Sequence, residues 1–286
     1  MLGLGTAVNR GGFVSGAAAA KLLDAYSGAA AAYSLRQLSN SYSGNAVKVR
    51  RASDDTELDI GFSSGELDTS ALATHCGSSD GFVVTWYDQS GNSNNATQST
   101  AAYQPKIYDG TSGVVTDNGK PAVEFDGSND LLSVSVTSSN IITTNAENTM
   151  LAVMNQDSAS VTNGLVSMAS PRFVTYTDYN GTLYYDAGNN STNRLSVSSP
   201  SGWDDTQHLL FFSCSTTLQQ ICVDGTQLAS NGSQSTISSA STTLDIGKYT
   251  TSYIAGMVQE LVLYPSDEAS NRTAIESDIN AFYSIY

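Results

Sequence analysis

Charged residues are scarce in this chain. Asp, Glu, Lys and Arg make up 14% of its 286 residues, and Lys and Arg together supply only 12. Surface helices draw on Glu, Lys and Arg, so a chain poor in them and rich in Ser, Thr, Asn and Gly is expected to form strands and turns. The acidic excess gives a formal net charge of −15. Such a chain repels phosphate backbones and anionic lipids, which argues against nucleic-acid and membrane partners.

Cysteine and histidine are scarce too. Cys76, Cys214 and Cys222 are too few for a disulfide framework, so we expect buried free thiols and folding in a reducing cytoplasm. His75 and His208 are too few and too isolated for a transition-metal site. Aspartates in FDGSND and YDQSGN favour turns, in which a side-chain oxygen accepts a backbone N–H. We therefore expect no cofactor, with Ca²⁺ bound by these aspartates as the alternative.

Long apolar runs are absent. No stretch approaches the roughly 18 apolar residues of a transmembrane helix. The Ala-rich stretches near the N-terminus are too short and too weakly apolar for a signal peptide. Hydrophobic residues still make up 40% of the chain, which is enough for a core. We expect a folded protein made in the cytoplasm without a signal peptide.

The chain does contain many short strand-like segments. They are β-branched, aromatic or alternating and are bounded by Gly, Asn, Asp or Ser, as in a β-sandwich. Helices are expected only at 69–75 and in the tail, where Ile275, Ile279 and Phe282 follow a cap at Ser266 or Asp267. The expected strands are 46–51, 81–87, 121–127, 131–136, 149–155, 164–169, 172–177, 182–187, 208–214, 219–225, 242–247 and 257–264.

Residues 1–32 differ from the remainder in being rich in Gly and Ala, with one helix-capable patch at 17–26. Because so many glycines raise the entropy cost of ordering, we expect an extended arm that orders against a partner, or else a frayed terminus. The sequence thus divides into an N-terminal docking arm, 1–32, and a β-sandwich, 33–286.

The C-terminal segment 244–283 reads as a strand, a loop, a Gly-led strand carrying Glu260, and a closing helix. This ending resembles the laminin-G/concanavalin-A-like superfamily. The resemblance implies an all-β, concanavalin-A-like β-sandwich (jelly roll) with a short C-terminal helix. Sandwiches of that superfamily commonly bind glycans or proteins through a rim or a concave face.

The stretches VRRASDD (49–55) and WYDQSGN (86–92) resemble the catalytic domain of fungal α-L-arabinofuranosidase B. That family uses a Glu on a central strand as nucleophile and an Asp after an IGG stretch as acid. At these places the chain has Asp178 and Asp186 but no Glu, and Lys248 and Tyr249. The family's cysteine pair is reduced to Cys76, because Gly81 stands at the second position. The resemblance therefore implies the fold without these catalytic groups.

The same motifs, together with the arm, resemble structural proteins of tailed bacteriophages. The preferred prediction is a non-enzymatic virion structural protein, either a tail fibre or appendage or a surface decoration. Its arm would dock onto other virion proteins, and its sandwich would bind a host-surface glycan or receptor. Because viral appendages are usually symmetric, we expect a homo-oligomer.

The alternative prediction is a glycoside hydrolase or depolymerase related to arabinofuranosidases, acting on arabinose-containing or capsular polysaccharide. Glu124 and Glu260, both on predicted strands, are the candidates for a relocated carboxylate pair. A secreted lectin-like protein is a third reading, which the lack of a signal peptide disfavours.

Tyrosine is abundant, with 15 residues, and is concentrated in YTDYNGTLYY (176–185) and GKYTTSY (247–253). Tyr side chains stack on sugar rings or anchor protein contacts at low entropic cost. The alternative is that about half of them are core or sheet residues, since Tyr is a good strand former. No catalytic or metal-binding residue is predicted. The candidate ligand-binding residues are Tyr176, Tyr179, Tyr184, Tyr185, Tyr249 and Tyr253, with Gln89 and Asn92 in the WYDQSGN turn.

Overall fold

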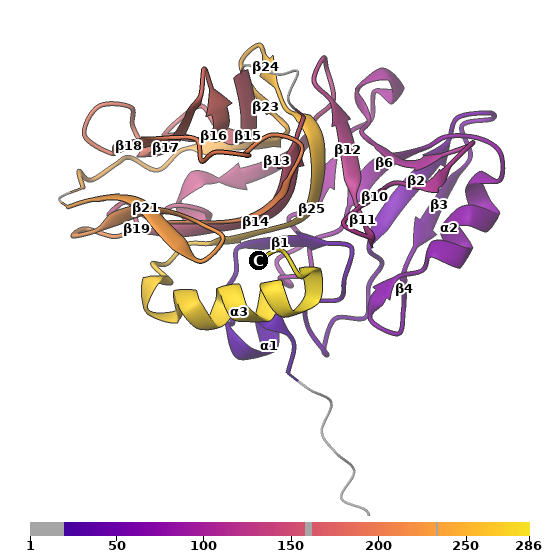
Figure 1. The fold of residues 1–286 in the computed structure, drawn as a ribbon, viewed down its shortest axis with the longest axis horizontal. Helices are drawn as coiled ribbons and strands as arrows, with labels where there is room; N and C mark the ends of the chain where they lie inside the picture. The colour runs from indigo at the N-terminus through magenta and orange to yellow at the C-terminus, as the bar shows by residue number, and fades with distance from the viewer. Residues whose placement is uncertain (1–19, 158–161, 233) are drawn as a thin grey trace, which may run out of the picture.

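A computed structural model describes residues 20–157, 162–232 and 234–286. Nineteen strands join one antiparallel sheet that curls back on itself, and three two-stranded ribbons accompany it (Figure 1). The main-sheet strands are β1 (Ala31–Ser34), β2 (Val47–Arg51), β3 (Glu57–Ile60), β6 (Gly81–Trp86), β7 (Ala96–Thr97), β8 (Lys106–Asp109), β9 (Gly113–Val114), β12 (Val123–Asp126), β13 (Leu132–Thr137), β14 (Asn148–Gln156), β15 (Thr162–Met168), β16 (Arg172–Tyr179), β17 (Thr182–Gly188), β18 (Arg194–Ser198), β19 (Gln207–Cys214), β20 (Gln219–Val223), β21 (Thr226–Asn231), β22 (Ser241–Ile246) and β25 (Ala255–Tyr264).

The smaller elements lie around this sheet. The ribbons are β4 (Phe62–Ser63) with β5 (Glu66–Leu67), β10 (Thr116–Asp117) with β11 (Lys120–Pro121), and β23 (Lys248–Tyr249) with β24 (Ser252–Tyr253). The helices are α1 (Leu22–Ala25), α2 (Thr69–Cys76) and α3 (Arg272–Tyr283), with 3₁₀ turns η1 (Ala101–Tyr103), η2 (Ser138–Asn140) and η3 (Ala269–Asn271). Within the described ranges, none of the helices has the length and apolar character needed to cross a membrane.

The hydrogen-bonded ladder nearly closes. From β21 it runs through β20, β19, β14 and β25 to β12, β8 and β6, and then through β7, β13, β22, β15, β16 and β17 to β18. The last strand, β18, lies against β20 and β21 at the other end of the ladder. Two layers therefore face each other, with β15–β18 above β14, β19 and β25 in the view of Figure 1.

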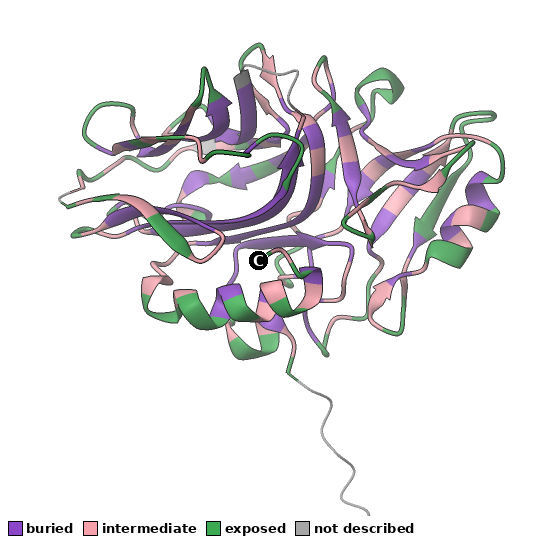
Figure 2. Cartoon of the chain, in the orientation of Figure 1, coloured by how far each residue is buried: buried purple, intermediate pink, exposed green. Residues whose placement is uncertain are grey.

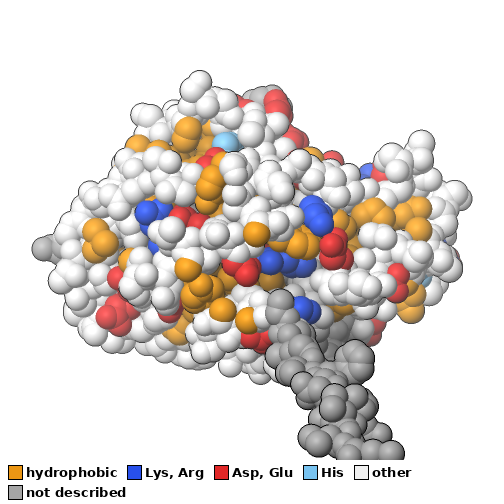
Figure 3. Space-filling view, turned by 60° about the horizontal axis from the view of Figure 1, so that its bottom comes forward, with side chains coloured by type: hydrophobic (Ala, Val, Ile, Leu, Met, Phe, Trp, Pro, Cys, Tyr) orange, Lys and Arg blue, Asp and Glu red, His pale blue; other side chains and the backbone are white. Residues whose placement is uncertain are grey.

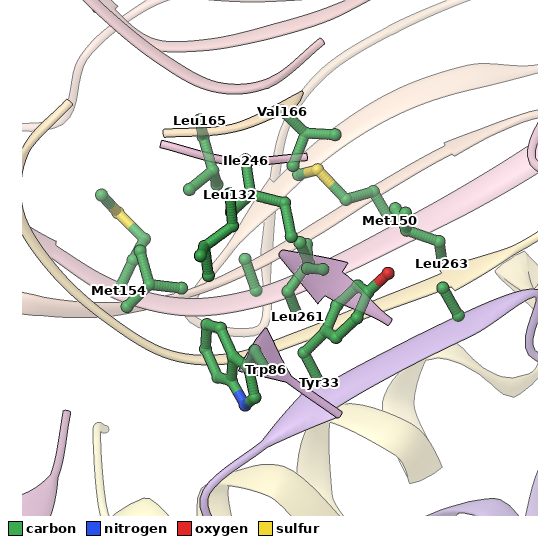
Figure 4. Close-up of a cluster of buried hydrophobic side chains, with 14 of the residues drawn as sticks. Tyr33, Trp86, Leu132, Met150, Met154, Leu165, Val166, Ile246, Leu261 and Leu263 are labelled. Carbon is green, nitrogen blue, oxygen red and sulfur yellow. The ribbon is translucent and has the colours of Figure 1, made fainter. Parts of the chain in front are cut away.

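The main core fills the space between these layers. Leu132, Leu165 and Ile246 of one layer point toward Met150 and Leu261 of the other (Figure 4). Burial follows the strands of both layers, whereas the loops at the rim are exposed (Figure 2). Strand side chains alternate between the two faces of a sheet, so each inward residue of the predicted pattern contributes to this core.

A second hydrophobic cluster lies under α1 and α3. β14 is buried on both faces, so Met150 and Met154 enter the main core while Leu151 and Val153 enter the second cluster. Ile275 of α3 packs on the face of β14 that bears Leu151 and Val153. Figure 3 shows the outside of this part of the molecule, where acidic and basic side chains are interspersed. The helix closing the chain is thus part of the fold.

Most predicted strands and the helix at 69–75 are confirmed, with ends shifted by at most two residues, and the tail helix is confirmed with a later start. The predicted cap of the tail helix is wrong. Oδ1 of Asp267 accepts from the N–H of Ala269 and so stabilises η3, whereas α3 begins only at Arg272. The prediction of buried free thiols is confirmed for all three cysteines.

Residues 20–32 belong to the body of the structure. Leu22 is fully buried, and β1 pairs with β25 in the register Ala31↔Leu263. A structural boundary therefore does not fall at residue 32, because the segment supplies core residues and a strand of the main sheet. Residues 1–19 of the predicted docking arm lie outside the described residues.

The WYDQSGN turn holds β1 in place. The carboxylate of Asp88 accepts hydrogen bonds from the N–H groups of Ala32 (2.8 Å), Ser90 (2.8 Å) and Asn94 (2.9 Å). The amide of Gln89 contacts the backbone of residues 34–38 through three further bonds. The expectation that Asp88 satisfies backbone N–H groups is confirmed, and the turn ties the N-terminal strand to β6.

The substitution Asp88→Ala tests this tie. It leaves three N–H groups without their acceptor, and each buried unsatisfied donor costs about 1–3 kcal/mol. We expect the free energy of unfolding to fall by about 3 kcal/mol in urea titrations followed by tryptophan fluorescence. Glu57→Ala, which removes an exposed carboxylate 3.8 Å from Lys48, should change it by less than about 1 kcal/mol. Equal effects of the two substitutions would show that the turn does not hold β1.

Candidate functional site

Three successive strands present one polar and aromatic face. β16, β17 and β18 pair antiparallel with Tyr176 opposite Tyr184 and Asp186 opposite Arg194. Because strand side chains alternate, Arg172 joins these residues on the same face. Asn180 and Gly181 make the β16–β17 turn with φ values of 54° and 78°, the left-handed pair that an Asn-Gly hairpin favours. The sequence YNGT therefore fixes the register that assembles this face.

A buried carboxylate orders two arginines on this face. Asp186 is fully buried, and its oxygens accept from Nε of Arg172 (2.5 Å) and from Nε and Nη2 of Arg194 (2.6 and 2.7 Å). Partial burial of Arg172 works against its charge, but the bond to Asp186 and its charge outweigh this and raise the pKa of the guanidinium. Both arginines stay charged at every working pH, so two positive charges face one negative charge.

Four tyrosines surround the arginines. The ring of Tyr176 contacts those of Tyr179, Tyr184 and Tyr249 edge-on, with centroids 5.4, 6.1 and 5.5 Å away. Burial raises the pKa of Tyr176, against the opposing effect of Arg172. The guanidinium of Arg194 lies 4.9 Å from the ring of Tyr184, and that of Arg172 lies 4.7 Å from the ring of Tyr249. Such cation–π contacts fix the rings in place.

Tyr249 reaches this cluster from a distant part of the chain. It lies in β23, directly after β22, and β23 packs on β15. A Cβ atom on Gly164 would be 2.8 Å from the backbone N of Tyr249, so only glycine at 164 permits this approach. Nη1 of Arg172 then donates to the phenol oxygen of Tyr249. The two segments in which the resemblance located catalytic groups, the central strands and the stretch after Gly247, therefore meet.

A pocket of about 250 Å³ opens over this face, which we call the tyrosine–arginine pocket. Its size is slightly below the range of sites for drug-sized ligands and suits a single sugar unit. The lining side chains are Arg172, Tyr176, Tyr179, Tyr184, Asn190 and Arg194. A larger cavity of about 610 Å³ lies beside the WYDQSGN turn, but its lining is small and uncharged, so it offers less to recognise a ligand.

The structure brings together Tyr176, Tyr179, Tyr184 and Tyr249 of the sequence-predicted set. Tyr185 is fully buried and faces the core, where its hydroxyl contacts the side chain of Asn148, so it is not accessible to a ligand. Tyr253 lies in β24, opposite Lys248.

Two further residues of the set bind backbone. The side-chain amide of Gln89 forms hydrogen bonds with the backbone of residues 34–38, and Nδ2 of Asn92 donates to the carbonyls of Ala29 and Ala30. Sequence reasoning missed Arg172, Asp186, Asn190 and Arg194 as part of the site. Alternation along RFVTYT and RLSVS would have placed both arginines on the face of Tyr176, but the pairing of β16 with β17 and β18 had to be known first.

The two glutamates considered for a relocated carboxylate pair lie apart in the fold. Glu260 is fully buried and bound by Nε (2.8 Å) and Nη2 (3.0 Å) of Arg36, which makes it a structural group. Glu124 lines a shallow depression of about 440 Å³ with Asp126 and Asp130. Burial, and secondly the carboxylate of Asp126, raise the pKa of Asp130 to about 7. Within the described parts of the chain, no His, Cys, Asp and Glu side chains are grouped to hold a metal ion.

The fold is that of solved arabinofuranosidases. One relative is an arabinofuranosidase complexed with arabinofuranosyl-α-1,2-xylobiose, with 20% sequence identity and a TM-score of 0.64. Another is a mutant of a GH54 α-L-arabinofuranosidase soaked with 4-nitrophenyl α-L-arabinofuranoside, with 20% identity and a TM-score of 0.66. Each match covers 88% of this chain and 62% of the other, so the chain spans about 62% of the length of these enzymes. No match was found among curated proteins.

The family model for the catalytic domain of alpha-L-arabinofuranosidase B matches residues 24–198, which is more than half of the chain. The chain belongs to this family. The preferred prediction, a non-enzymatic virion structural protein, is therefore wrong, and so is the expectation that the chain is not an enzyme. The alternative, a glycoside hydrolase, agrees with the match. The match begins at residue 24, inside the predicted arm, and covers the sandwich as far as β18, whereas the preferred prediction depended on a few positions and on the arm.

Asp130→Asn should change how the stability of the protein depends on pH. The carboxyl of Asp130 stays protonated in the folded state up to about pH 7 but ionises near pH 4 in the unfolded state. Between these values the unfolded state binds fewer protons, so the native protein loses stability as pH rises. We expect the variant to melt roughly 5 °C higher than the native protein at pH 8 and equally at pH 4.

Differential scanning calorimetry at the two pH values measures this effect. Asp55→Asn is the matched control, because the side chain of Asp55 is 75% exposed and pairs with Arg50 at the surface. It should shift the melting temperature by the same small amount at both pH values. A gain for Asp130→Asn that does not depend on pH would contradict the raised pKa.

Proposed function

We propose that this chain is a glycoside hydrolase domain that acts on arabinose-containing or capsular polysaccharide and holds one sugar unit in the tyrosine–arginine pocket. The single observation that carries the proposal is the meeting of β16–β17 with β23 beside that pocket, where Tyr249 contacts Tyr176 and Arg172 of its lining. These are the segments in which the arabinofuranosidase resemblance locates its catalytic groups. Family membership and fold support the same reading.

The pocket has the composition of a sugar site. Aromatic rings offer flat apolar faces to the C–H groups of a sugar, and phenols, amides and guanidiniums bond to its hydroxyls. Tyr179, of which 44% is exposed, and Asn190 present such groups at the mouth of the pocket. We propose that the pocket lies on a concanavalin-A-like jelly roll, in keeping with the two facing antiparallel layers. The domain is proposed to act without a metal ion.

Tyr249 is the residue we assign as nucleophile. Some glycoside hydrolases use a Tyr in this role instead of a carboxylate. The guanidinium of Arg172 donates to the phenol oxygen of Tyr249 and so stabilises negative charge that develops there. Asp186 holds Arg172 in this position. The phenol oxygen would form a bond to the anomeric carbon as the bond from that carbon to the leaving-group oxygen breaks, and the phenol proton would pass to solvent. Water would then attack the same carbon, break its bond to Tyr249 and return a proton to the phenol oxygen.

Departure of the leaving group receives weak assistance in this site. Among the described residues, the pocket lining contains phenols, an amide and guanidiniums, and no carboxyl. Phenols, with an ordinary pKa near 10, are weak acids. Rates should therefore depend strongly on how readily the leaving group departs without a proton.

We expect the purified protein to hydrolyse 4-nitrophenyl α-L-arabinofuranoside faster than the methyl glycoside, because nitrophenolate departs unprotonated. Nitrophenol release and reducing-sugar release from arabinan and capsular polysaccharide measure this. A wild-type protein that releases no sugar from any of these substrates overturns the proposed function. Equal rates on the aryl and methyl glycosides would instead show that an acid is supplied from elsewhere.

Tyr249→Phe tests the assigned nucleophile. The variant keeps the ring that packs on Tyr176 and removes only the hydroxyl, so we expect kcat to fall at least about 100-fold with the melting temperature nearly unchanged. Tyr103→Phe is the control, because Tyr103 is an exposed tyrosine in η1, outside the pocket. Undiminished activity of Tyr249→Phe would refute the role of this phenol while leaving the hydrolase assignment intact.

A further inference from the structure

The tyrosine–arginine pocket differs in charge from the chain as a whole. The formal net charge is −15, yet in the pocket two guanidiniums face the single carboxylate of Asp186. Neither Asp nor Glu is among the described residues that line the pocket, and Asp186 is fully buried beneath them. One positive charge therefore remains uncompensated under an opening walled by aromatic rings, and such a site attracts an anion.

Arg194 has the donor that is free to bind it. Its Nε and Nη2 both donate to Asp186, which fixes the plane of the guanidinium. In the ranges that the structure describes, Nη1 of Arg194 makes no hydrogen bond, and 31% of the side chain is exposed. A guanidinium held in this way binds a carboxylate with a charge-assisted hydrogen bond and loses little side-chain conformational entropy on binding.

Arg172 adds charge but is less exposed than Arg194. Its Nε binds Asp186 and its Nη1 binds Tyr249, and 20% of its side chain is exposed. Its positive charge nevertheless lies on the pocket wall and strengthens the attraction for an anion at Arg194. The two arginines therefore differ in what they bind: Nη1 of Arg194 is free to bind a ligand, whereas Nη1 of Arg172 donates to Tyr249.

The rings beside Arg194 indicate that the anion belongs to a sugar. Tyr184 lies under the guanidinium of Arg194, and the exposed Tyr179 stands next to Tyr184 with ring centroids 5.9 Å apart. A small inorganic ion would leave the exposed part of the Tyr179 ring without a contact from the ligand. A sugar that bears a carboxylate can place its ring against Tyr179 while its charge reaches Arg194.

We propose that the sugar bound in the tyrosine–arginine pocket is a uronic acid unit of an acidic polysaccharide, with its carboxylate on Nη1 of Arg194. The proposal rests on the proposed function, since it takes this pocket to be the sugar site, and it adds the substrate class. Arabinofuranose carries no charge, so family membership alone does not lead to an acidic sugar.

Binding to the unmodified protein provides the first test. Isothermal titration calorimetry at low ionic strength would compare methyl α-D-galacturonoside, its methyl ester and methyl α-D-galactoside. We expect the acid to bind at least about tenfold more tightly than either neutral sugar, and the difference to shrink as salt screens the charge. Equal binding of the acid and its ester overturns the proposal, and so does acetate that binds as tightly as the acid sugar.

The second test replaces the free donor. Arg194→Gln should lower affinity for the acid about tenfold and leave affinity for the neutral galactoside unchanged, and Arg194→Lys should restore part of the loss. Lys106→Gln removes the same charge far from the pocket and should change affinity less than twofold. An equal loss in Lys106→Gln would mean that net charge alone is responsible. If Arg194→Gln does not fold, the comparison of acid and ester on the native protein still decides.

These measurements separate the inference from the proposed function, because binding requires no turnover. Hydrolysis of arabinofuranosides by a protein without preference for the acid sugar would leave the hydrolase assignment intact and overturn the inference. Preference for the acid sugar in a protein that hydrolyses none of the tested glycosides would support the inference and overturn the hydrolase assignment.

Discussion

One buried carboxylate, Asp186, organises the site. Two guanidiniums side by side on a sheet would repel each other, and a fully buried aspartate without partners would not remain charged. The carboxylate of Asp186 reduces the repulsion between the two guanidiniums, and they in turn stabilise its charge, because each oxygen of Asp186 accepts a hydrogen bond from an arginine. The three residues come from β16, β17 and β18, so this contact also locks the register of the three strands and fixes the plane of Arg194, the orientation of Tyr184 and the donor that reaches Tyr249.

The curled sheet explains why the pocket draws on distant segments. β15 pairs with β16 on one side and with β22 on the other, and β23 follows β22 directly. The ribbon can then lie over β15 because Gly164 has no side chain. Tyr249 thereby reaches Tyr176, although the chain between them passes through the other layer of the sandwich. On the opposite side, α1 and α3 cover the face of β14 that does not enter the main core.

The motif WYDQSGN supports the architecture. The side chains of Asp88 and Gln89 form hydrogen bonds with the backbone of β1 and of the segment that follows it. A stretch of this kind identifies the fold, since the hydrogen bonds it makes are needed wherever the strand must be tied down. It carries little information on activity. The preferred functional prediction is wrong because the family match covers residues 24–198, whereas that prediction depended on a few positions and on the composition of residues 1–32.

The sequence by itself determined the strands, their inward faces, the closing helix and the concentration of tyrosine in two segments, because these follow from local periodicity and composition. It did not show that Tyr185 faces the core while Tyr184 faces the pocket, although alternation requires opposite faces. The pairing of Arg172 and Arg194 with Asp186, and the contact of Tyr249 with Tyr176, were decided only by the tertiary structure. They depend on strand register and on the path of the sheet, which bring together residues that no local pattern connects.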